Sequence, residues 1–476
     1  MNFSHSSATN FADNFVYPTP TGTLQTERQL SATGIISTVA GSDVSGYTGD
    51  GGLATAATLR RPLGITVDAL GNLFFSDFDN SVIRMILKST GIISTVAGIG
   101  SFGYTGDGGL ATSAAITHPI GIAIDTSGDL YFAQNFNNVI RKVLKSTGII
   151  STVVGTGSYG YSGDGGLATL ARLRRPTNLV LDASGNMYIA DSDSDVIRMV
   201  LKSTGIISTV AGIGFLAGFT GAGFTGDGLP ATLAKLRYPT GMAIDSFGDL
   251  YIADTYGAAI RKVLKSTGII STVAGTGSYG YTGDGGLATL AQLGNPASIA
   301  IDSFGNLFIA EPDFNVIRMV LKSTGIISTV AGTGVSGYTG DGGLATLAEL
   351  SSPNSIALDA TGGLYVSSNY DYDNIRFFST VAATPTEIPT PAPTETPSAT
   401  PSETPTETPS ETPTETPTET PSETPSETPS ETPSTSPSIE RSEAPSEVYL
   451  TTQPTSLYPT VNPSMKPKGH RCRRPQ

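Results

Sequence analysis

Tryptophan is absent from this chain of 476 residues, cysteine occurs once and histidine occurs three times. The single Cys472 cannot form a disulfide within the chain, so the stability of the fold must come from packing. Of the histidines only His118 lies between residues 34 and 383, which excludes a tri-histidine zinc centre within one chain. Charged residues make up 14% of the sequence, and no segment approaches the ~18 apolar residues of a membrane span.

Glycine, in contrast, occurs 56 times, among many short runs of Val, Ile, Leu and Tyr. This composition predicts an all-β protein with many tight turns. The formal net charge of -14 argues against a general affinity for nucleic acid, although many of the glutamates lie near the C-terminus.

The segment Gly-Ile-Ile-Ser-Thr-Val recurs along the chain and reveals its organisation. Its copies start at Gly34, Gly91, Gly148, Gly205, Gly268 and Gly325. Successive copies are 57 residues apart, except for one step of 63 residues after Gly205. A fixed period of this length predicts propeller blades or solenoid turns.

Each period contains four strand-like runs joined by glycine-bearing turns, which is the content of one antiparallel propeller blade. The first strands begin near Gly64, Gly121, Asn178, Gly241, Ser298 and Ser355. The sequence therefore predicts a six-bladed β-propeller of four-stranded antiparallel blades, followed by a disordered C-terminal tail. Residues 34–40 precede any blade, so we expect them to complete the last blade beside residues 374–378. Residues 379–383, a truncated copy, would compete for the same edge.

The fifth repeat, NPASIAIDSFGNLFIAEPDFNVIRMVLKSTGIISTVAG, resembles an NHL repeat, and all six copies share its pattern. This resemblance implies a propeller in which the first strand of each blade lines a central channel. The chain is then divided into an N-terminal extension (1–33), the NHL-repeat propeller (34–383), a Pro/Thr/Ser/Glu-rich stalk (384–437) and a tail with a basic end (438–476).

Two polar positions recur in every blade and are interpreted as scaffold. An aspartate ends each first strand, and an arginine lies in each third strand; we expect them to pair within or between blades. The aspartates are Asp68, Asp125, Asp182, Asp245, Asp302 and Asp359, and the arginines are Arg84, Arg141, Arg198, Arg261, Arg318 and Arg376.

A third aspartate recurs in a Gly-Asp-Gly segment, as at Asp50 and Asp164. One carboxylate per loop is too few for a calcium site, so we expect each to bond its own turn or to cap the short helical segment that follows. Asp191, Asp193 and Asp195 have the opening spacing of a calcium loop, but the required closing residues are missing. The sequence therefore predicts neither a metal site nor a cofactor.

Residues that differ between blades are candidates for binding. The loops that lead into the first strands and those that join the second and third strands should share one face. Aromatic and charged side chains in these loops suit protein or sugar recognition, although the aromatic rings could instead pack on neighbouring loops. The candidates are Phe78, Asp79, Phe136, Tyr256, Phe314, Tyr370, Arg61, Arg174 and Arg237.

The function expected from these features is that of a non-catalytic, monomeric scaffold for protein–protein or protein–glycan interaction, in cell-surface or wall adhesion. The alternatives are a single-stranded RNA-binding NHL propeller, with nucleic acid the less favoured partner, and a metal-dependent propeller hydrolase or lyase. The composition of residues 384–437 is that of an O-glycosylated stalk and favours a secreted or surface location. Met1 to Gln25 lack the apolar core of a secretory signal, which keeps a cytoplasmic location open.

Overall fold

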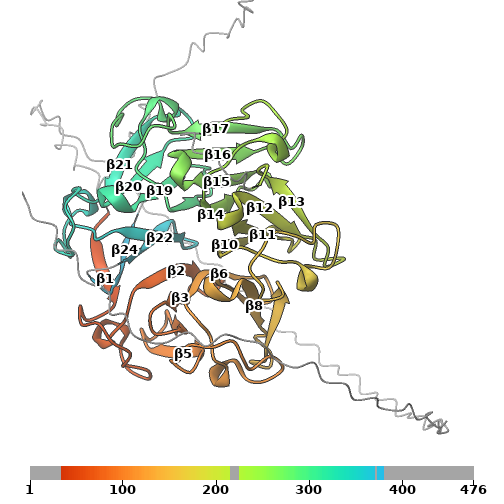
Figure 1. Ribbon diagram of the computed structural model, residues 1–476. Helices are drawn as coiled ribbons and strands as arrows, with labels where there is room; N and C mark the ends of the chain where they lie inside the picture. Colours follow the sequence, from red (N-terminus) through yellow and green to blue (C-terminus); the bar gives the residue numbers. More distant parts are fainter. Residues whose placement is uncertain (1–33, 215–223, 370–371, 380–476) are drawn as a thin grey trace, which may run out of the picture. The chain divides into compact units, whose positions relative to one another are not determined.

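The computed structural model describes residues 34–214, 224–369 and 372–379, which form six four-stranded antiparallel sheets arranged around an axis (Figure 1). The predicted fold class is confirmed. The N-terminal extension, the stalk, the tail and most of the truncated copy at 379–383 lie outside the described residues.

Each blade is built from strands that follow one another in the chain. Blade 1 contains β2 (Pro62–Val67), β3 (Leu73–Asp77), β4 (Val82–Ile86) and β5 (Ile93–Ala97), and blade 2 contains β6 (Pro119–Ile124), β7 (Leu130–Gln134), β8 (Val139–Val143) and β9 (Ile150–Val154). Blade 3 contains β10 (Pro176–Leu181), β11 (Met187–Asp191), β12 (Val196–Val200) and β13 (Ile207–Ala211), and blade 4 contains β14 (Pro239–Ile244), β15 (Leu250–Asp254), β16 (Ala259–Val263) and β17 (Ile270–Ala274). Blade 5 contains β18 (Ser298–Ile301), β19 (Leu307–Glu311), β20 (Val316–Val320) and β21 (Ile327–Ala331), and blade 6 contains β22 (Pro353–Leu358), β23 (Gly363–Ser368), β24 (Ile375–Ser379) and β1 (Ile36–Ala40).

All helices in the described part of the chain are single 3₁₀ turns of three residues, and none of them could cross a membrane. Six precede first strands: η1 (Ala54–Ala56), η2 (Ala111–Ser113), η4 (Ala168–Leu170), η6 (Ala231–Leu233), η8 (Ala288–Leu290) and η10 (Ala345–Leu347). Four join second and third strands: η3 (Asn135–Asn137), η5 (Ser192–Ser194), η7 (Thr255–Gly257) and η9 (Pro312–Phe314).

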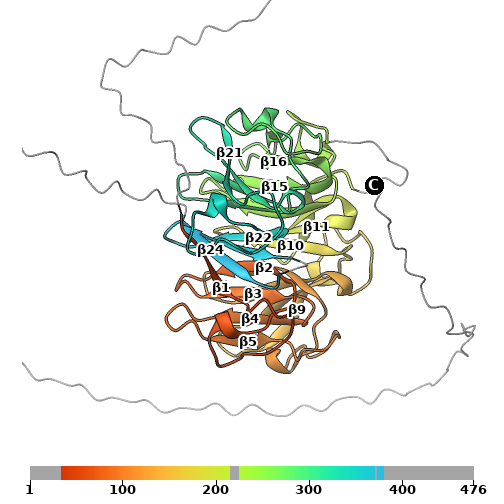
Figure 2. The ribbon, with the colours of Figure 1, turned by 90° about the vertical axis from the view of Figure 1, so that its left-hand side faces the viewer.

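The ring closes through β1, which pairs with β24 and places Ile36 opposite Phe378 (Figure 2). This pairing confirms the predicted position of residues 34–40 and joins two segments from opposite ends of the propeller sequence. Ser379 does not compete for that edge, because it extends β24 and pairs with Gly363 in β23.

The glycine-rich segments between blades cover the outer edges of the sheets. In blade 1, Gly51 N–H donates to the carbonyl of Ile93, and Ile93 N–H donates to the carbonyl of Gly52. The same pattern closes blade 6, where Gly342 N–H donates to Ile36. Outer strands therefore present few unpaired backbone groups, which limits edge-to-edge association.

The repeated arginines pair with the Gly-Asp-Gly aspartates and not with the aspartates that end the first strands. Arg84 is fully buried and donates through Nε and Nη2 to Asp50 Oδ1, at 3.2 and 2.7 Å, and through Nη1 to the carbonyl of Thr58. The other pairs are Arg141–Asp107, Arg198–Asp164, Arg261–Asp227, Arg318–Asp284 and Arg376–Asp341. The expected pairing was wrong because Arg84 lies in the middle of the sheet, opposite Phe75, whereas Asp68 lies beyond the strand end.

The aspartates after the first strands instead form the turns of the hairpins. Asp68 Oδ1 accepts hydrogen bonds from the backbone N–H groups of Leu70 and Asn72. Asp125, Asp182, Asp245, Asp302 and Asp359 make equivalent bonds. The Gly-Asp-Gly carboxylates do not cap the 3₁₀ turns either, since the second oxygen of Asp50 accepts a hydrogen bond from Thr95 N–H in β5.

One inter-blade loop lacks a hydrogen bond that four of the other loops make, which leads to a stability prediction. Tyr161 stacks on Arg198 and its hydroxyl lies 2.7 Å from Thr209 Oγ1, whereas the equivalent Phe224 leaves the buried Thr272 Oγ1 without a partner among the described residues. Phe224→Tyr is expected to restore this bond and raise the free energy of unfolding by about 1 kcal/mol.

Chemical denaturation of the two chains measures this difference. Phe224→Leu provides the control, because it removes the ring without adding a hydroxyl and should destabilise the propeller. A lower stability for Phe224→Tyr would show that this loop has no room for the hydroxyl.

Candidate ligand-binding face

The face that carries the candidate residues is formed by loops that neighbouring blades hold in place. The residue before the first strand has a positive φ, as at Arg175 (49°) and Tyr238 (51°). Its backbone N–H donates to a side chain of the preceding blade: Arg175 N–H to Asn138 Oδ1 at 3.1 Å, and Tyr238 N–H to Asp195 Oδ1 at 2.7 Å. These bonds between blades make the loops a preorganised surface.

The predicted aromatic residues divide into exposed and packed side chains. Phe136 and Tyr256 are each 53% exposed, but Phe78 is only 7% exposed. Phe78 packs against His118 at 4.5 Å between ring centroids, and Phe314 lies half-buried beside Tyr281 at 5.4 Å. Phe78 is therefore a packing residue, because the neighbouring blade covers it. Tyr370 lies outside the described residues.

The charged candidates are partly engaged within the face. Arg61 lies over the Phe78 ring, with its Nη1 3.5 Å from Asp79, and donates through Nε to Asn369 Oδ1. Arg174 and Arg237 line a pocket in another part of the face. The structure therefore divides the eight described candidates into separate groups. Arg61, Phe78 and Asp79 lie together, and Arg174, Arg237 and Tyr256 line the pocket.

Three exposed aromatic residues were missed by the sequence prediction. Phe102, Tyr159 and Tyr279 are 64%, 52% and 57% exposed. Each lies in a Gly-Ser-Phe/Tyr-Gly segment of an inter-blade loop, which the sequence presents mainly as turn chemistry. An aromatic residue flanked by serine and glycine was the available signal, because these small neighbours in the sequence cover little of the ring.

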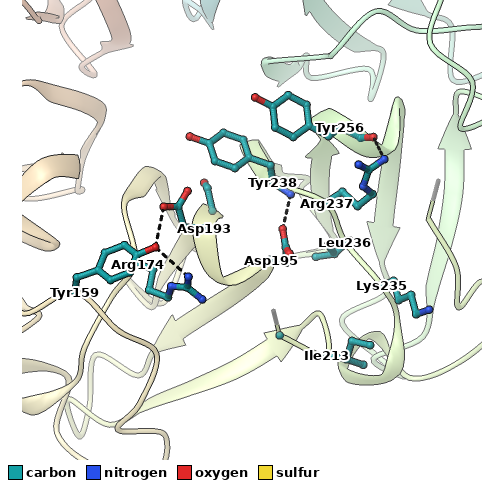
Figure 3. Close-up of a pocket in the computed structure, with 12 residues that line it drawn as sticks. Tyr159, Arg174, Asp193, Asp195, Ile213, Lys235, Leu236, Arg237, Tyr238 and Tyr256 are labelled. Carbon is teal, nitrogen blue, oxygen red and sulfur yellow. Dashed lines mark hydrogen bonds between the residues drawn. The ribbon is translucent and has the colours of Figure 1, made fainter. Parts of the chain in front are cut away.

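The pocket lies between blades 3 and 4 and has a volume of about 390 Å³ (Figure 3). Three tyrosines, Tyr159, Tyr238 and Tyr256, form much of its wall. The charged lining consists of Arg174, Lys235, Arg237, Asp193 and Asp195. A cavity of this size with a few placed polar groups is typical of small-ligand sites.

The three aspartates with calcium-loop spacing point to different partners. Asp191 is buried and accepts the backbone N–H of Arg174, Asp193 accepts the hydroxyl of Tyr159, and Asp195 accepts the N–H of Tyr238. In the described ranges, no three His, Cys, Asp or Glu side chains are grouped so that they could hold a metal ion.

Comparison with known proteins agrees with the repeat pattern. The profile of the teneurin NHL domain matches residues 31–105, 100–162 and 210–282. The chain is an NHL-repeat propeller. Teneurin-4 of Mus musculus is 30% identical over 290 residues, which are 54% of this chain and 10% of teneurin-4. The chloroplastic protein SUPPRESSOR OF QUENCHING 1 of Arabidopsis thaliana is 29% identical over 277 residues, which are 57% of this chain and 26% of that protein.

A solved structure supports the fold of this NHL propeller. An auxiliary nutrient binding protein from Bacteroides ovatus superposes with a TM-score of 0.52 at 15% identity, over 73% of this chain and 76% of that one. The chain thus spans a tenth to a quarter of the length of the two sequence relatives, and the structural likeness concerns the fold alone.

The first strands of the NHL propeller line a central channel of about 400 Å³, as the family resemblance implied. Small residues keep these strands close together. A Cβ atom at Gly121 would lie 2.4 Å from Asn178 Cα, and one at Gly241 would lie 2.6 Å from Ser298 Cα. The channel walls are therefore set by backbone packing.

Beneath the loop face, the second strands of four blades end in a buried carboxylate: Asp77, Asp191, Asp254 and Glu311. In blade 4, Asp254 Oδ1 accepts the N–H of Arg237, and Oδ2 has no hydrogen-bond partner among the described residues although it lies 3.7 Å from Arg261. Burial raises the pKa of all four groups to about 7. Blade 2 carries the neutral Gln134 at the same position.

These carboxylates predict that the propeller becomes less stable as the pH rises from about 4 to about 7. Their pKa values are higher in the folded chain than in the unfolded one, so the folded state binds more protons across this range. Melting temperatures measured from pH 4.5 to 7.5 should fall accordingly. Asp254→Asn removes one of the four titrating carboxylates and should make the melting temperature fall less steeply with pH. Gln134→Glu adds a carboxylate at the same position of blade 2 and is the opposite control, because it should make the fall steeper. An unchanged slope in both variants would show that these groups do not titrate in this range.

Proposed function

We propose that this NHL propeller is a non-catalytic binding scaffold that holds a protein or glycan ligand on its loop-rich face. The observation that carries this proposal is the set of exposed aromatic side chains on the same preorganised loop face as the charged pocket. Phe136, Tyr256 and Tyr279 expose half or more of their surface on loops that neighbouring blades tie together. Aromatic side chains on rigid loops supply contact area at low entropic cost.

The comparisons support binding in general terms. The Bacteroides ovatus protein shares only the fold, and its name shows that the fold serves a nutrient-binding protein. Display at a cell surface or wall belongs to the proposal because residues 384–437 have the composition of a stalk.

Two matched triple variants test which face binds. The loop-face variant replaces Phe136, Tyr256 and Tyr279 by alanine. The control variant replaces Leu70, Phe247 and Phe304, which are also exposed but lie in turns between first and second strands, at the opposite ends of the blades. Circular dichroism establishes that both fold.

The two variants and the unmodified chain are compared on an array of purified polysaccharides and on a displayed peptide library. The loop-face variant is expected to lose at least about tenfold in retention of each ligand, as expected for truncated aromatic anchors, and the control is not. Equal retention by the loop-face variant would contradict the proposal, and recovery of a chemically altered ligand would contradict the non-catalytic role.

A further inference from the structure

The pocket between blades 3 and 4 has one flat wall. The rings of Tyr238 and Tyr256 stack with centroids 5.0 Å apart and planes 24° apart, and Figure 3 shows them side by side at one end of the pocket. Flat amphipathic rings of this kind offer an apolar surface together with hydroxyl groups. Such a wall suits the C–H face of a sugar ring.

The rest of the lining is dense in hydrogen-bonding groups. Tyr159 Oη accepts a hydrogen bond from Arg174 Nη2 at 3.0 Å and donates one to Asp193 Oδ2 at 3.2 Å. Leu236, one of the few aliphatic residues of the lining, is itself buried. The described lining residues accordingly form no deep apolar hole for the anchoring side chain of a peptide, whereas a polyhydroxylated ring finds donors and acceptors on several sides.

The charges in the pocket favour an anion. Three cationic side chains face two carboxylates, and Asp193 already lies 3.7 Å from Arg175, which is not part of the lining. Burial also raises the pKa of Asp195. The pocket therefore has an excess of positive charge, although the whole chain is acidic.

Arg237 is the group best placed to receive that anion. Its Nη1 donates to the carbonyl of Tyr256 at 3.0 Å, and its other guanidinium N–H groups make no hydrogen bond to the described residues. Figure 3 shows its side chain beside Tyr256. A planar guanidinium presents two parallel N–H donors, which match the two oxygens of a carboxylate.

We propose that this pocket binds a carboxylate-bearing sugar, a hexuronic acid unit of an acidic polysaccharide, with its ring against Tyr238 and Tyr256 and its carboxylate on Arg237. The inference rests on the proposed function and names the ligand class of the same face. The volume of about 390 Å³ accommodates such a sugar unit and part of its neighbour.

Isothermal titration calorimetry of the full chain with trimers of galacturonic and glucuronic acid tests this proposal. At least one trimer is expected to bind, and its methyl ester, which lacks the charge, is expected to bind at least tenfold more weakly. Arg237→Gln should weaken binding of the acid by about 10- to 100-fold, the loss of a charged hydrogen-bonded pair, and leave binding of the ester unchanged. Tyr256→Ala should weaken both. Lys202→Gln, which makes the same change of charge at a turn between third and fourth strands, should change neither.

Each other outcome overturns the inference. Equal affinity for acid and ester would exclude the carboxylate contact, tighter binding of a sulfated trisaccharide would exclude a carboxylate as the preferred anion, and full affinity of Arg237→Gln would place the site elsewhere. If neither trimer binds while the loop-face variant still loses its array ligands, the sugar acid is wrong and the binding scaffold stands. If the loop-face variant keeps all ligands, the proposed function fails as well.

Discussion

A chain that starts at residue 41 instead of residue 34 is expected to melt on the order of 10 °C lower. The removed segment contains β1, the outer strand of blade 6. Ile36 and Ala40 are fully buried, and each belongs to a different core cluster, so the deletion exposes apolar surface on two sides of the blade. It also uncovers the edge of β24.

Differential scanning calorimetry of the two chains measures this effect, and analytical ultracentrifugation measures the self-association expected of an uncovered strand edge. A chain that starts at residue 34 is the control, since it retains all of β1. If removal of residues 34–40 left the melting temperature unchanged while removal of residues 379–383 lowered it, the assigned closure would be wrong.

Replacing Arg318 by glutamine is expected to lower the free energy of unfolding by about 3–5 kcal/mol. The guanidinium is fully buried, donates to Asp284 Oδ1 through Nε and Nη2, and donates to the carbonyls of Gln292 and Thr282. The shorter amide cannot reach all of these acceptors, so two carbonyl groups and the partly exposed Asp284 lose a donor. The fully buried Glu311, 3.4 Å from the guanidinium, loses its cationic partner as well.

Urea denaturation of the variant measures this loss. Arg172→Gln is the matched control, because Arg172 is an exposed arginine of an inter-blade loop and should change stability by less than about 0.5 kcal/mol. A similarly small change for Arg318→Gln would show that the arginine–aspartate pairs do not hold the loops onto the blades.

The sequence predicted the blades well because each blade is a local unit. The period of 57 residues, the short apolar runs and the turn glycines are all determined within one repeat, and hydrogen bonds between successive strands follow from them. The position of β1 could also be predicted. The sequence contains six outer strands and six sets of three inner strands, and the first outer strand precedes every set, so it must complete the last blade.

The candidate site was predicted less completely. Phe136 and Phe78 occupy similar loops and both contact His118, yet Phe136 is 53% exposed and Phe78 only 7%. The exposed Tyr159 and Tyr279 were overlooked because glycine-rich loops resemble simple turns in sequence. The exposure of an aromatic ring at these positions depends on which side chains of the adjacent blade cover it. Those side chains are dozens of residues away in the sequence.

By itself, the sequence determined the all-β class, the number of blades and the closure of the ring, because these features depend on periodic local pairing. Only the tertiary structure decided that Arg84 pairs with Asp50 and that Arg237 and Tyr256 share a pocket with Tyr159. It also decided that Asp254 is buried with one oxygen that accepts no hydrogen bond from the described residues. The physical reason is that partner choice for a polar side chain depends on three-dimensional distance and burial, which the repeat period leaves open.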